Sequence, residues 1–513
     1  MAATARQTGP PNILLIMTDQ QRWDSLGCYG ASWVQTPNLD RLAAEGVLFD
    51  HCYTDNPVCT PARASLMTGK PLPGHSVYRL HDVLPSEEVL FSRRLQQRGY
   101  QTALFGKLHV SGRIHEESQR HPNDGFDVYE WCLEAPVSMD SPFNGYSRWL
   151  KQKDPLFHDR LKRDGRKVLH IPGELHLTHW AAERSIDFIR DADPGRPFFC
   201  KMSVFDPHNP YQQYPVEMDQ LVNQQQIPEP IPAGTQPVPH ALTREREHNY
   251  FATAHTLDPA QLRKIRLGYF AMIGFIDQEV GRVLQTLEAR GIADNTMVIF
   301  CSDHGDMLGD HGLMVKGAFF YDANIRVPLI VRWPAGGLRV GSRVQGLVQL
   351  RDLAATVLSA AGADPEHTAQ QLPDSLDLLP VMRSGGAGTR PTAVCLYRNS
   401  GICDTGRAWD PPIHASMIRD QRYKLSLYHS EPVQRYPLQG QLFDMHNDPQ
   451  ERNDLWPDSS RLNHRLRLTE ALLEWLHRRE LALGSRAADA TPTPDQQLVN
   501  ANEPATGQRS TPT

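Results

Sequence analysis

Short apolar runs alternate with helical patterns along the first two thirds of the chain, and this alternation limits the fold more than any other feature. The run Asn12–Thr18 is continuously apolar, as expected of a strand buried on both faces of a parallel sheet. Similar runs cover residues 197–205 and Thr296–Ser302, with a long amphipathic pattern over 259–290 between them. We therefore predict an α/β fold whose large, mostly parallel sheet is sandwiched by helices.

Weaker patterns complete the prediction. They favour helices over residues 36–46, 86–99 and 178–192, and strands over 102–105 and 327–333. Residues 111–172 and 209–260 lack periodicity and are rich in Pro, His, Asn and Gln. Irregular insertions of this length in an α/β domain usually form lids and substrate pockets.

A glycine-rich segment at residues 384–388 reads as a linker. Beyond it, short strand-like runs at residues 392–397, 416–419, 423–428 and 441–444 precede a helix over about 458–483. We predict three parts. They are an N-terminal domain (1–384), a small C-terminal α+β subdomain with an antiparallel sheet (385–485), and a disordered tail (486–513) rich in Pro, Thr and Gln.

Polar residues follow four of the predicted strands directly. They are Asp19 and Gln20, Lys107 and His109, Asp206 and His208, and Asp303 and His304. In open α/β sheets the ligand lies beyond the carboxyl ends of the strands, so these side chains are expected to form one site.

The segment 59–69 (CTPARASLMTG) reads as the start of a helix. Pro61 suits the first helical position, Thr60 can cap the helix, and Gly69 can end it. Cys59 then lies at the positive end of the helix dipole, and Arg63 shares its face one turn later.

This segment resembles the signature C-x-P-x-R-A-S-L-x-T-G of the type I sulfatases, in the alkaline phosphatase-like superfamily, and matches every fixed position. The resemblance runs from about Asn12 to about Trp456 and includes residues 441–444 and 448–453, which resemble segments of the family's C-terminal subdomain. It implies that a formylglycine-generating maturation enzyme oxidises Cys59 to Cα-formylglycine.

The resemblance implies one divalent metal ion, with calcium expected and manganese as the alternative. Its ligands would be Asp19, Gln20, Cys59, Asp303 and His304. Gln20 replaces the family's second aspartate, so one negative charge is lost. Together with His304, this replacement weakens the case for calcium and leaves room for manganese.

The resemblance also implies roles for the remaining polar residues. Arg63 and His109 would hold the formylglycine hydrate, Lys107 and Lys316 would bind the sulfuryl group, and His208 would lie near the leaving group. One hydroxyl of the hydrate would attack sulfur, His208 or Lys316 would protonate the departing alcohol, and the second hydroxyl would then lose its proton as sulfate leaves. The expected enzyme is a sulfuric ester hydrolase acting on a small-molecule sulfate ester.

Two rival functions stay open. Gln20 and His304 also suit a phosphonate monoester or phosphodiester hydrolase using the same formylglycine, whereas Lys107 and His109 favour sulfate. A non-catalytic, anion-binding member would keep Cys59 as a thiol. The sequence does not identify the alcohol half of the ester.

Composition sets the remaining limits. Over 513 residues the net charge of −6 excludes the basic excess of a nucleic-acid binder. Eight cysteines in a chain this long do not form a disulfide scaffold, and Cys200 and Cys301 lie in apolar runs typical of buried thiols. Neither a secretory signal nor a membrane helix of roughly 20 apolar residues is visible, so we expect a cytoplasmic protein. Whether it is a homo-oligomer stays open.

Overall fold

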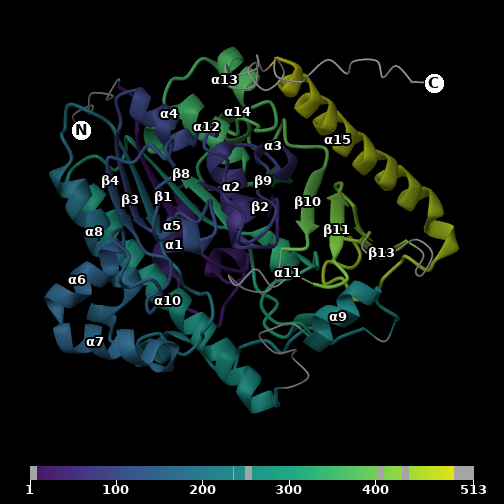
Figure 1. Cartoon of the computed structure of the whole chain (residues 1–513), viewed down its shortest axis with the longest axis horizontal. Coiled ribbons are helices and arrows are strands. Elements are labelled where there is room, and N and C mark those ends of the chain that lie inside the picture. The colour runs from purple at the N-terminus through teal and green to yellow at the C-terminus, as the bar shows by residue number, and fades with distance from the viewer. Residues whose placement is uncertain (1–8, 235, 249–256, 401–408, 430–437, 490–513) are drawn as a thin grey trace, which may run out of the picture.

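A computed structural model of the chain describes residues 9–234, 236–248, 257–400, 409–429 and 438–489. Its core is a nine-stranded sheet (Figure 1). In spatial order the strands are β4 (Val128–Trp131), β3 (Gln101–Gly106), β5 (Phe198–Ser203), β1 (Asn12–Thr18), β6 (Thr296–Ser302), β8 (Leu329–Arg332), β2 (Val47–Tyr53) and β7 (Arg326–Val327), with β9 (Ser342–Gln349) paired to β2. The first five run parallel, so the predicted mostly parallel sheet is confirmed.

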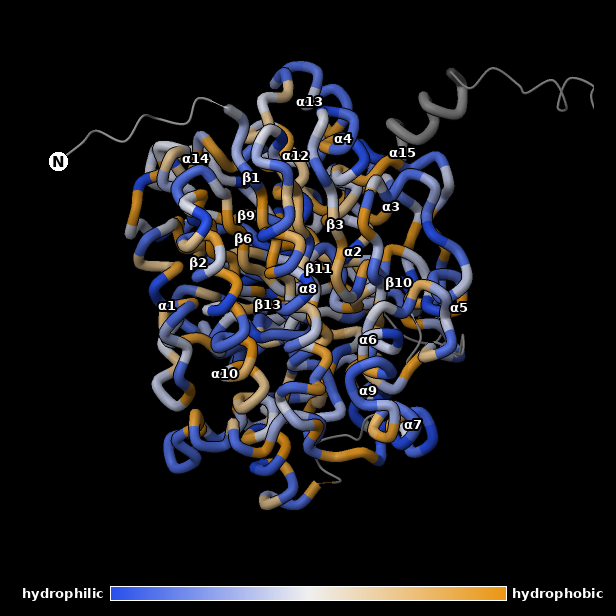
Figure 2. Tube along the Cα trace, turned by 90° about the vertical axis from the view of Figure 1, so that its left-hand side faces the viewer, coloured by the Kyte–Doolittle hydropathy of each residue, from blue (hydrophilic) through white to orange (hydrophobic). Residues whose placement is uncertain are grey.

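Strand β1 lies at the centre of this sheet, where Leu14 pairs with Cys200 of β5 and Val298 of β6. Its side chains alternate between two cores. Leu14 and Ile16 face α1 (Pro37–Ala44), α8 (Leu177–Asp191) and α10 (Pro259–Ala289), while Ile13 and Leu15 face α2 (Cys59–Thr68), α4 (Phe91–Gln97) and α12 (Asp352–Ala360). Figure 2 shows hydrophobic residues along these inner strands and hydrophilic ones on the outer helices.

The weaker predictions differ from the structure in three places. The helix predicted over 86–99 begins only at Phe91, because Glu88 instead binds Lys70 and Leu90 is extended. The stretch 111–172 contains α5 (Arg113–Glu116), β4, α6 (Gly145–Lys153) and α7 (Pro155–Asp164). Pro328 has no N–H for the ladder and divides the strand predicted over 327–333 into β7 and β8, which run antiparallel to their neighbours.

The C-terminal part forms a separate four-stranded antiparallel sheet, as predicted. Its strands are β10 (Ala393–Arg398), β11 (His414–Arg419), β12 (Tyr423–Tyr428) and β13 (Gln439–Asp444). Helix α15 (Leu462–Asp489) packs Leu468 and Leu472 onto this sheet and runs past the predicted end at 483 (Figure 1). Residues 490–513 of the predicted tail lie outside the described residues, and the domain boundary at 384 stays a prediction.

The seven cysteines in the described part of the chain are free thiols, Cys200 and Cys301 among them. Among the described helices, none combines the length and the apolar composition that a membrane span requires.

Candidate active site

The predicted site residues come together at the carboxyl ends of β3, β5, β1 and β6, which are neighbours in the sheet. Polar side chains follow each of these strands within a few residues, directly after β3, β1 and β6 and after Val204 and Phe205 beyond β5, so adjacent strand ends place them side by side. The Asp19 N–H donates to the Asp206 carbonyl at 3.2 Å and ties the ends of β1 and β5 together.

Helix α2 brings Cys59 to this edge of the sheet. It begins at Cys59, and Gly69 ends it with a φ of 71°, as predicted. The prediction that Thr60 caps the helix is wrong, because Val58 is the N-cap and Thr60 lies in the first turn. The Thr60 hydroxyl donates to the Leu80 carbonyl at 2.9 Å instead.

Arg63 is completely buried and connects the strand ends to one another. Its Nε donates to Asp303 Oδ2 at 2.6 Å and its Nη2 to Asp19 Oδ2 at 3.2 Å. Its Nη1 donates to the Lys107 carbonyl at 2.9 Å and to Ser203 Oγ at 3.0 Å. Arg63 therefore fixes two carboxylates in place, a role that the helix pattern alone does not reveal.

Two carboxylates of this cluster are ionised at neutral pH. Burial alone would raise the pKa of Asp19, but Lys107, whose Nζ bonds to Asp19 Oδ2, and then Arg63 hold it well below its usual range. Burial also opposes ionisation of Asp303, and Arg63 lowers its pKa below the ordinary value. The site is therefore a buried arrangement of paired opposite charges.

Asp19, Asp303 and His304 form a group suited to a divalent cation. All three are buried, and one ligand atom from each lies within 4.8 Å of the others. His304 Nδ1 donates to the Gly305 carbonyl at 2.9 Å, so its Nε2 carries the lone pair that could ligate, which faces Lys316 Nζ at 3.3 Å. That Nε2 lies 3.7 Å from Asp19 Oδ1, a buried oxygen without a hydrogen-bond partner in the described residues. These residues fit the metal that the sequence predicts.

Gln20 is also completely buried beside this group. Its Nε2 donates to Asp306 Oδ2 at 2.6 Å, and no described residue hydrogen-bonds to its Oε1. Sequence reasoning missed Asp306, although its place three residues after Asp303 is a usable signal.

Lys316 and His208 lie at the solvent side of the site, and they are the candidates that stay partly exposed. Lys316 Nζ lies 3.9 Å from Cys59 Sγ, 2.8 Å from His208 Nε2 and 3.3 Å from His304 Nε2. Burial raises the pKa of Cys59, but Lys107 and Lys316 outweigh it and bring the pKa below its ordinary value. The position of Cys59 thus favours an anionic group.

The hydrogen bonds of His208 define its protonation. Its Nδ1 lies 2.7 Å from the Asn209 carbonyl, which can only accept, so Nδ1 carries the proton and Nε2 accepts from Lys316. Burial, followed by Lys316, lowers the pKa of His208 well below its usual value. Lys316, not His208, therefore holds the proton of this pair.

His109 adopts a left-handed backbone, with a φ of 55°. The buried Glu116 carboxylate accepts from the N–H groups of His109, Val110 and Ser111 at 2.9, 2.7 and 3.1 Å and holds this turn. The turn places His109 Nε2 3.1 Å from the hydroxyl of Thr60, next to Cys59. Nothing in the sequence identified Glu116 beforehand.

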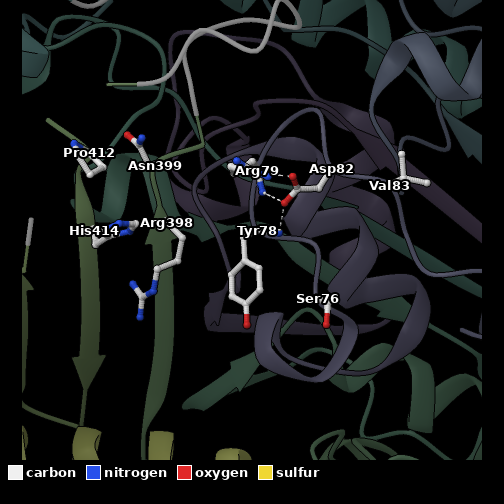
Figure 3. A pocket seen from close by; sticks show the side chains of 9 residues that line it. All are labelled: Ser76, Tyr78, Arg79, Asp82, Val83, Arg398, Asn399, Pro412 and His414. Atoms are coloured by element: carbon white, nitrogen blue, oxygen red, sulfur yellow. Dashed lines mark hydrogen bonds and ion pairs between the residues drawn. The ribbon is translucent and has the colours of Figure 1, made fainter. Parts of the chain in front are cut away.

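A hollow of about 780 Å³ lies between residues 76–83 and the first strands of the small sheet (Figure 3). Arg79 donates to Asp82 at 2.8 Å on one side, and Arg398 and His414 face them from β10 and β11 (Figure 3). None of the candidate residues lines this hollow. It is distinct from the cluster around Cys59.

Comparisons with known proteins agree with this geometry. Residues 11–363 match the protein family Sulfatase. An arylsulfatase of Clostridium perfringens is 32% identical over 363 residues, which cover 68% of this chain and 75% of that protein. A choline-sulfatase of Rhizobium meliloti is 29% identical and matches 87% of this chain and 83% of that enzyme. The crystal structure of a phosphonate monoester hydrolase of Agrobacterium radiobacter has a TM-score of 0.73 and 26% identity, covering 91% of this chain and 96% of that one. The chain therefore belongs to the sulfatase family of sulfuric ester hydrolases.

Proposed function

We propose that the chain hydrolyses sulfate monoesters to an alcohol and inorganic sulfate, with formylglycine at position 59 as the source of the nucleophile. The observation that carries this proposal is the place of Cys59. It starts a buried helix, and the Lys316 ammonium lies 3.9 Å from its sulfur. A sulfate ester carries one negative charge, which cations placed in a dry site stabilise as the ester bond breaks.

The hydrogen bonds of the site suggest how its residues share the reaction. A hydroxyl of the hydrated aldehyde loses its proton to water and forms a bond to sulfur while the bond from sulfur to the alcohol oxygen breaks. Lys316 gives its proton to that oxygen, and His208 Nε2 orients the ammonium. The second hydroxyl then gives its proton to the neutral Lys316 amine, the carbon–oxygen bond to sulfate breaks, and the aldehyde and the ammonium re-form.

Asp19, Gln20, Asp303, His304 and the residue at position 59 would hold the metal, with calcium expected and manganese as the alternative. When bound, this ion supplies positive charge to the sulfuryl oxygens and to the nucleophile. Arg63 and Lys107 keep the Asp19 carboxylate ionised and in position for it.

A phosphonate monoester hydrolase is the second candidate. The match to the Agrobacterium radiobacter structure favours it, as do Gln20 and His304, whereas Lys107 and His109 favour a sulfatase. The third candidate, an anion-binding protein, requires that Cys59 stays a thiol.

Two further predictions from the sequence are a cytoplasmic location and a formylglycine-generating partner enzyme. The oligomeric state stays open.

Hydrolysis of an aryl sulfate and a phenyl phosphonate by the same protein, co-expressed with a formylglycine-generating enzyme, separates these candidates. We expect a higher kcat/KM for the sulfate. A higher kcat/KM for the phosphonate would overturn the proposal in favour of the second candidate. Protein that still carries only cysteine at position 59 after this co-expression, and that hydrolyses neither ester, would favour the third.

A further inference from the structure

We infer that Asp306 is a positioning residue that fixes the side-chain amide of Gln20, so that its Oε1 is presented as a metal ligand. Tyr211 and the backbone of residue 308 hold Asp306 in turn. This inference rests on the proposed metal site and explains how an amide functions where the family pattern has a second aspartate.

The main chain of Gln20 is hydrogen-bonded on both sides. Its N–H donates to Asp303 Oδ1 at 3.0 Å, and its carbonyl accepts from the Tyr269 hydroxyl at 2.8 Å. Its φ of 66° lies in the left-handed region, which few residues other than glycine adopt unless hydrogen bonds like these hold the backbone. The position of the Gln20 Cα is therefore well defined, and the side-chain torsions alone decide where the amide lies.

Two acceptors set the orientation of the amide. Nε2 lies 2.6 Å from Asp306 Oδ2 and 3.4 Å from Asn209 Oδ1. A carboxylate and an amide oxygen both accept, so the NH₂ group must face them, and the opposite orientation would place Oε1 against a carboxylate oxygen.

Asp306 is itself held in place by two donors. The Tyr211 hydroxyl donates to its Oδ2 at 2.7 Å, and the Leu308 N–H donates to its Oδ1 at 2.9 Å. Tyr211 belongs to the Pro-His-Asn-Pro-Tyr segment that also carries His208. The segment next to the predicted leaving group therefore also supports the metal site.

The consequence is that Oε1 of Gln20 is left for a cation. It is a buried oxygen without a hydrogen-bond partner in the described residues, as is Oδ1 of the adjacent Asp19. The carboxyl group that position 20 lacks is supplied by Asp306, which lies 2.6 Å from the Nε2 side of the amide. A hydrogen bond from an amide to a carboxylate makes the amide oxygen a stronger donor to a metal.

Titration calorimetry with Ca²⁺ and with Mn²⁺ on protein that retains Cys59 tests this inference without any turnover. We expect Asp306→Asn to weaken the binding of both ions by about 10- to 100-fold, the usual effect of losing an outer-shell partner. Asp277→Asn is the matched control, because Asp277 on α10 is a buried carboxylate that also accepts from an amide, Asn38 Nδ2, at 2.9 Å. It should bind both ions like wild type.

An exchange of the two groups keeps the test decisive if Asp306→Asn folds poorly. Gln20→Glu alone sets two carboxylates against each other and should lower thermal stability. Gln20→Glu with Asp306→Asn restores the hydrogen bond in the opposite direction, so stability and metal binding should return to at least the wild-type level. Unchanged binding by Asp306→Asn, or a double variant no better than Gln20→Glu, would overturn the inference alone. Wild-type protein that binds neither ion would overturn the proposed metal site as well.

Discussion

Two of the buried clusters of charge in this molecule differ in whether the carboxylate at their centre is fully hydrogen-bonded within the chain. The interface cluster, Asp322, Arg419, Lys424 and Glu451, joins the large sheet to the small one. Both oxygens of Asp322 accept from the Tyr53 hydroxyl at 3.0 Å, and Lys424 Nζ lies 2.7 Å from one of them. Every oxygen of this central carboxylate has a donor within the chain.

The site cluster, Asp19, Arg63, Lys107 and Asp303, is equally buried but incomplete. Asp19 Oδ1 has no hydrogen-bond partner in the described residues, and Gln20 Oε1 beside it has none either. Burying an unpaired polar atom costs free energy, so these two adjacent oxygens are available to a ligand. In the interface cluster, Glu451 Oε1 also accepts no hydrogen bond from the described part of the chain, but it lies 2.6 Å from Lys424 Nζ. Buried charge alone therefore does not mark a functional site, and the site cluster differs by its two adjacent unpaired oxygens next to His304.

The largest expected effect comes from Cys59→Ala. It should abolish turnover, by about a thousandfold or more, while the fold stays intact. Cys200→Ala, which removes a buried thiol from β5, is the control and should retain activity once folded. Turnover by Cys59→Ala within about tenfold of wild type would contradict the formylglycine proposal.

Removal of divalent ions tests whether the unpaired oxygens of the site cluster bind a cation. Chelation should abolish activity, and calcium or manganese should restore it, because the unpaired oxygens of Asp19 and Gln20 need a cation. Elemental analysis before and after chelation checks the metal content. Full activity in protein shown to be metal-free would contradict the proposal that the reaction needs a metal ion.

Lys107→Ala and Lys316→Ala should each lower kcat/KM by about a hundredfold or more, and the losses should not add because both act on one charge.

The free energies of unfolding of these two variants should differ. Lys107 is buried against Asp19, so its loss should cost about 3 kcal/mol or more, whereas partly exposed Lys316 should cost about 0.5 kcal/mol or less. Kinetics on fully converted protein and urea unfolding measure the two effects. Wild-type kcat/KM in both variants, with exposed Lys162→Ala as control, would exclude these lysines from the site.

The interface cluster should respond in the opposite way. Asp322→Asn removes the carboxylate that Arg419 pairs with and leaves Lys424 only Glu451, so it should lower the free energy of unfolding by about 3 to 5 kcal/mol. Below its unfolding temperature, the variant should keep kcat/KM within about twofold of wild type, since it touches no site residue. Asp140→Asn at an exposed ion pair should cost less than about 1 kcal/mol. A well-folded but inactive Asp322→Asn protein would show that the interface cluster is also needed for activity, which contradicts the proposed difference between the clusters.

The smallest expected effect concerns His75, which packs under α2 and donates its Nε2–H to Ser65 Oγ at 2.8 Å. Burial, followed by Lys70, lowers the pKa of His75 to about 3. Because the unfolded side chain has a pKa of about 6.5, its contribution is complete above that pH and is lost as pH falls toward 3. Between pH 7.5 and 5 this should cost about 2 kcal/mol of stability. Urea unfolding of His75→Gln should show a flatter pH dependence, and an unchanged slope would refute this assignment.

The sequence predicted the parts of the fold that carry strong local signals. Strand β1 is continuously apolar, and α10 begins at Pro259 after Asp258, which caps it through a reciprocal bond with Gln261. Helices α6 and α7 escaped prediction because they are short and mostly polar, although Asn144 and Asp154 cap them.

The site residues were predictable where each directly follows a strand. What the sequence could not show is which residue each one meets. Arg63 reads as one turn beyond Cys59, yet its carboxylate partners Asp19 and Asp303 lie 44 and 240 positions away along the chain. Glu116 supports His109 from within a stretch without periodicity, so only the folded chain reveals its role.

The most direct test of the central claim is mass spectrometry of the peptide around position 59, paired with aryl sulfate turnover by the same preparations. Preparations made with and without a formylglycine-generating enzyme supply a range of conversion. We predict that kcat per molecule rises in proportion to the fraction that carries formylglycine and approaches zero for fully unmodified Cys59. Undiminished turnover by protein that contains only cysteine at position 59 would contradict the account.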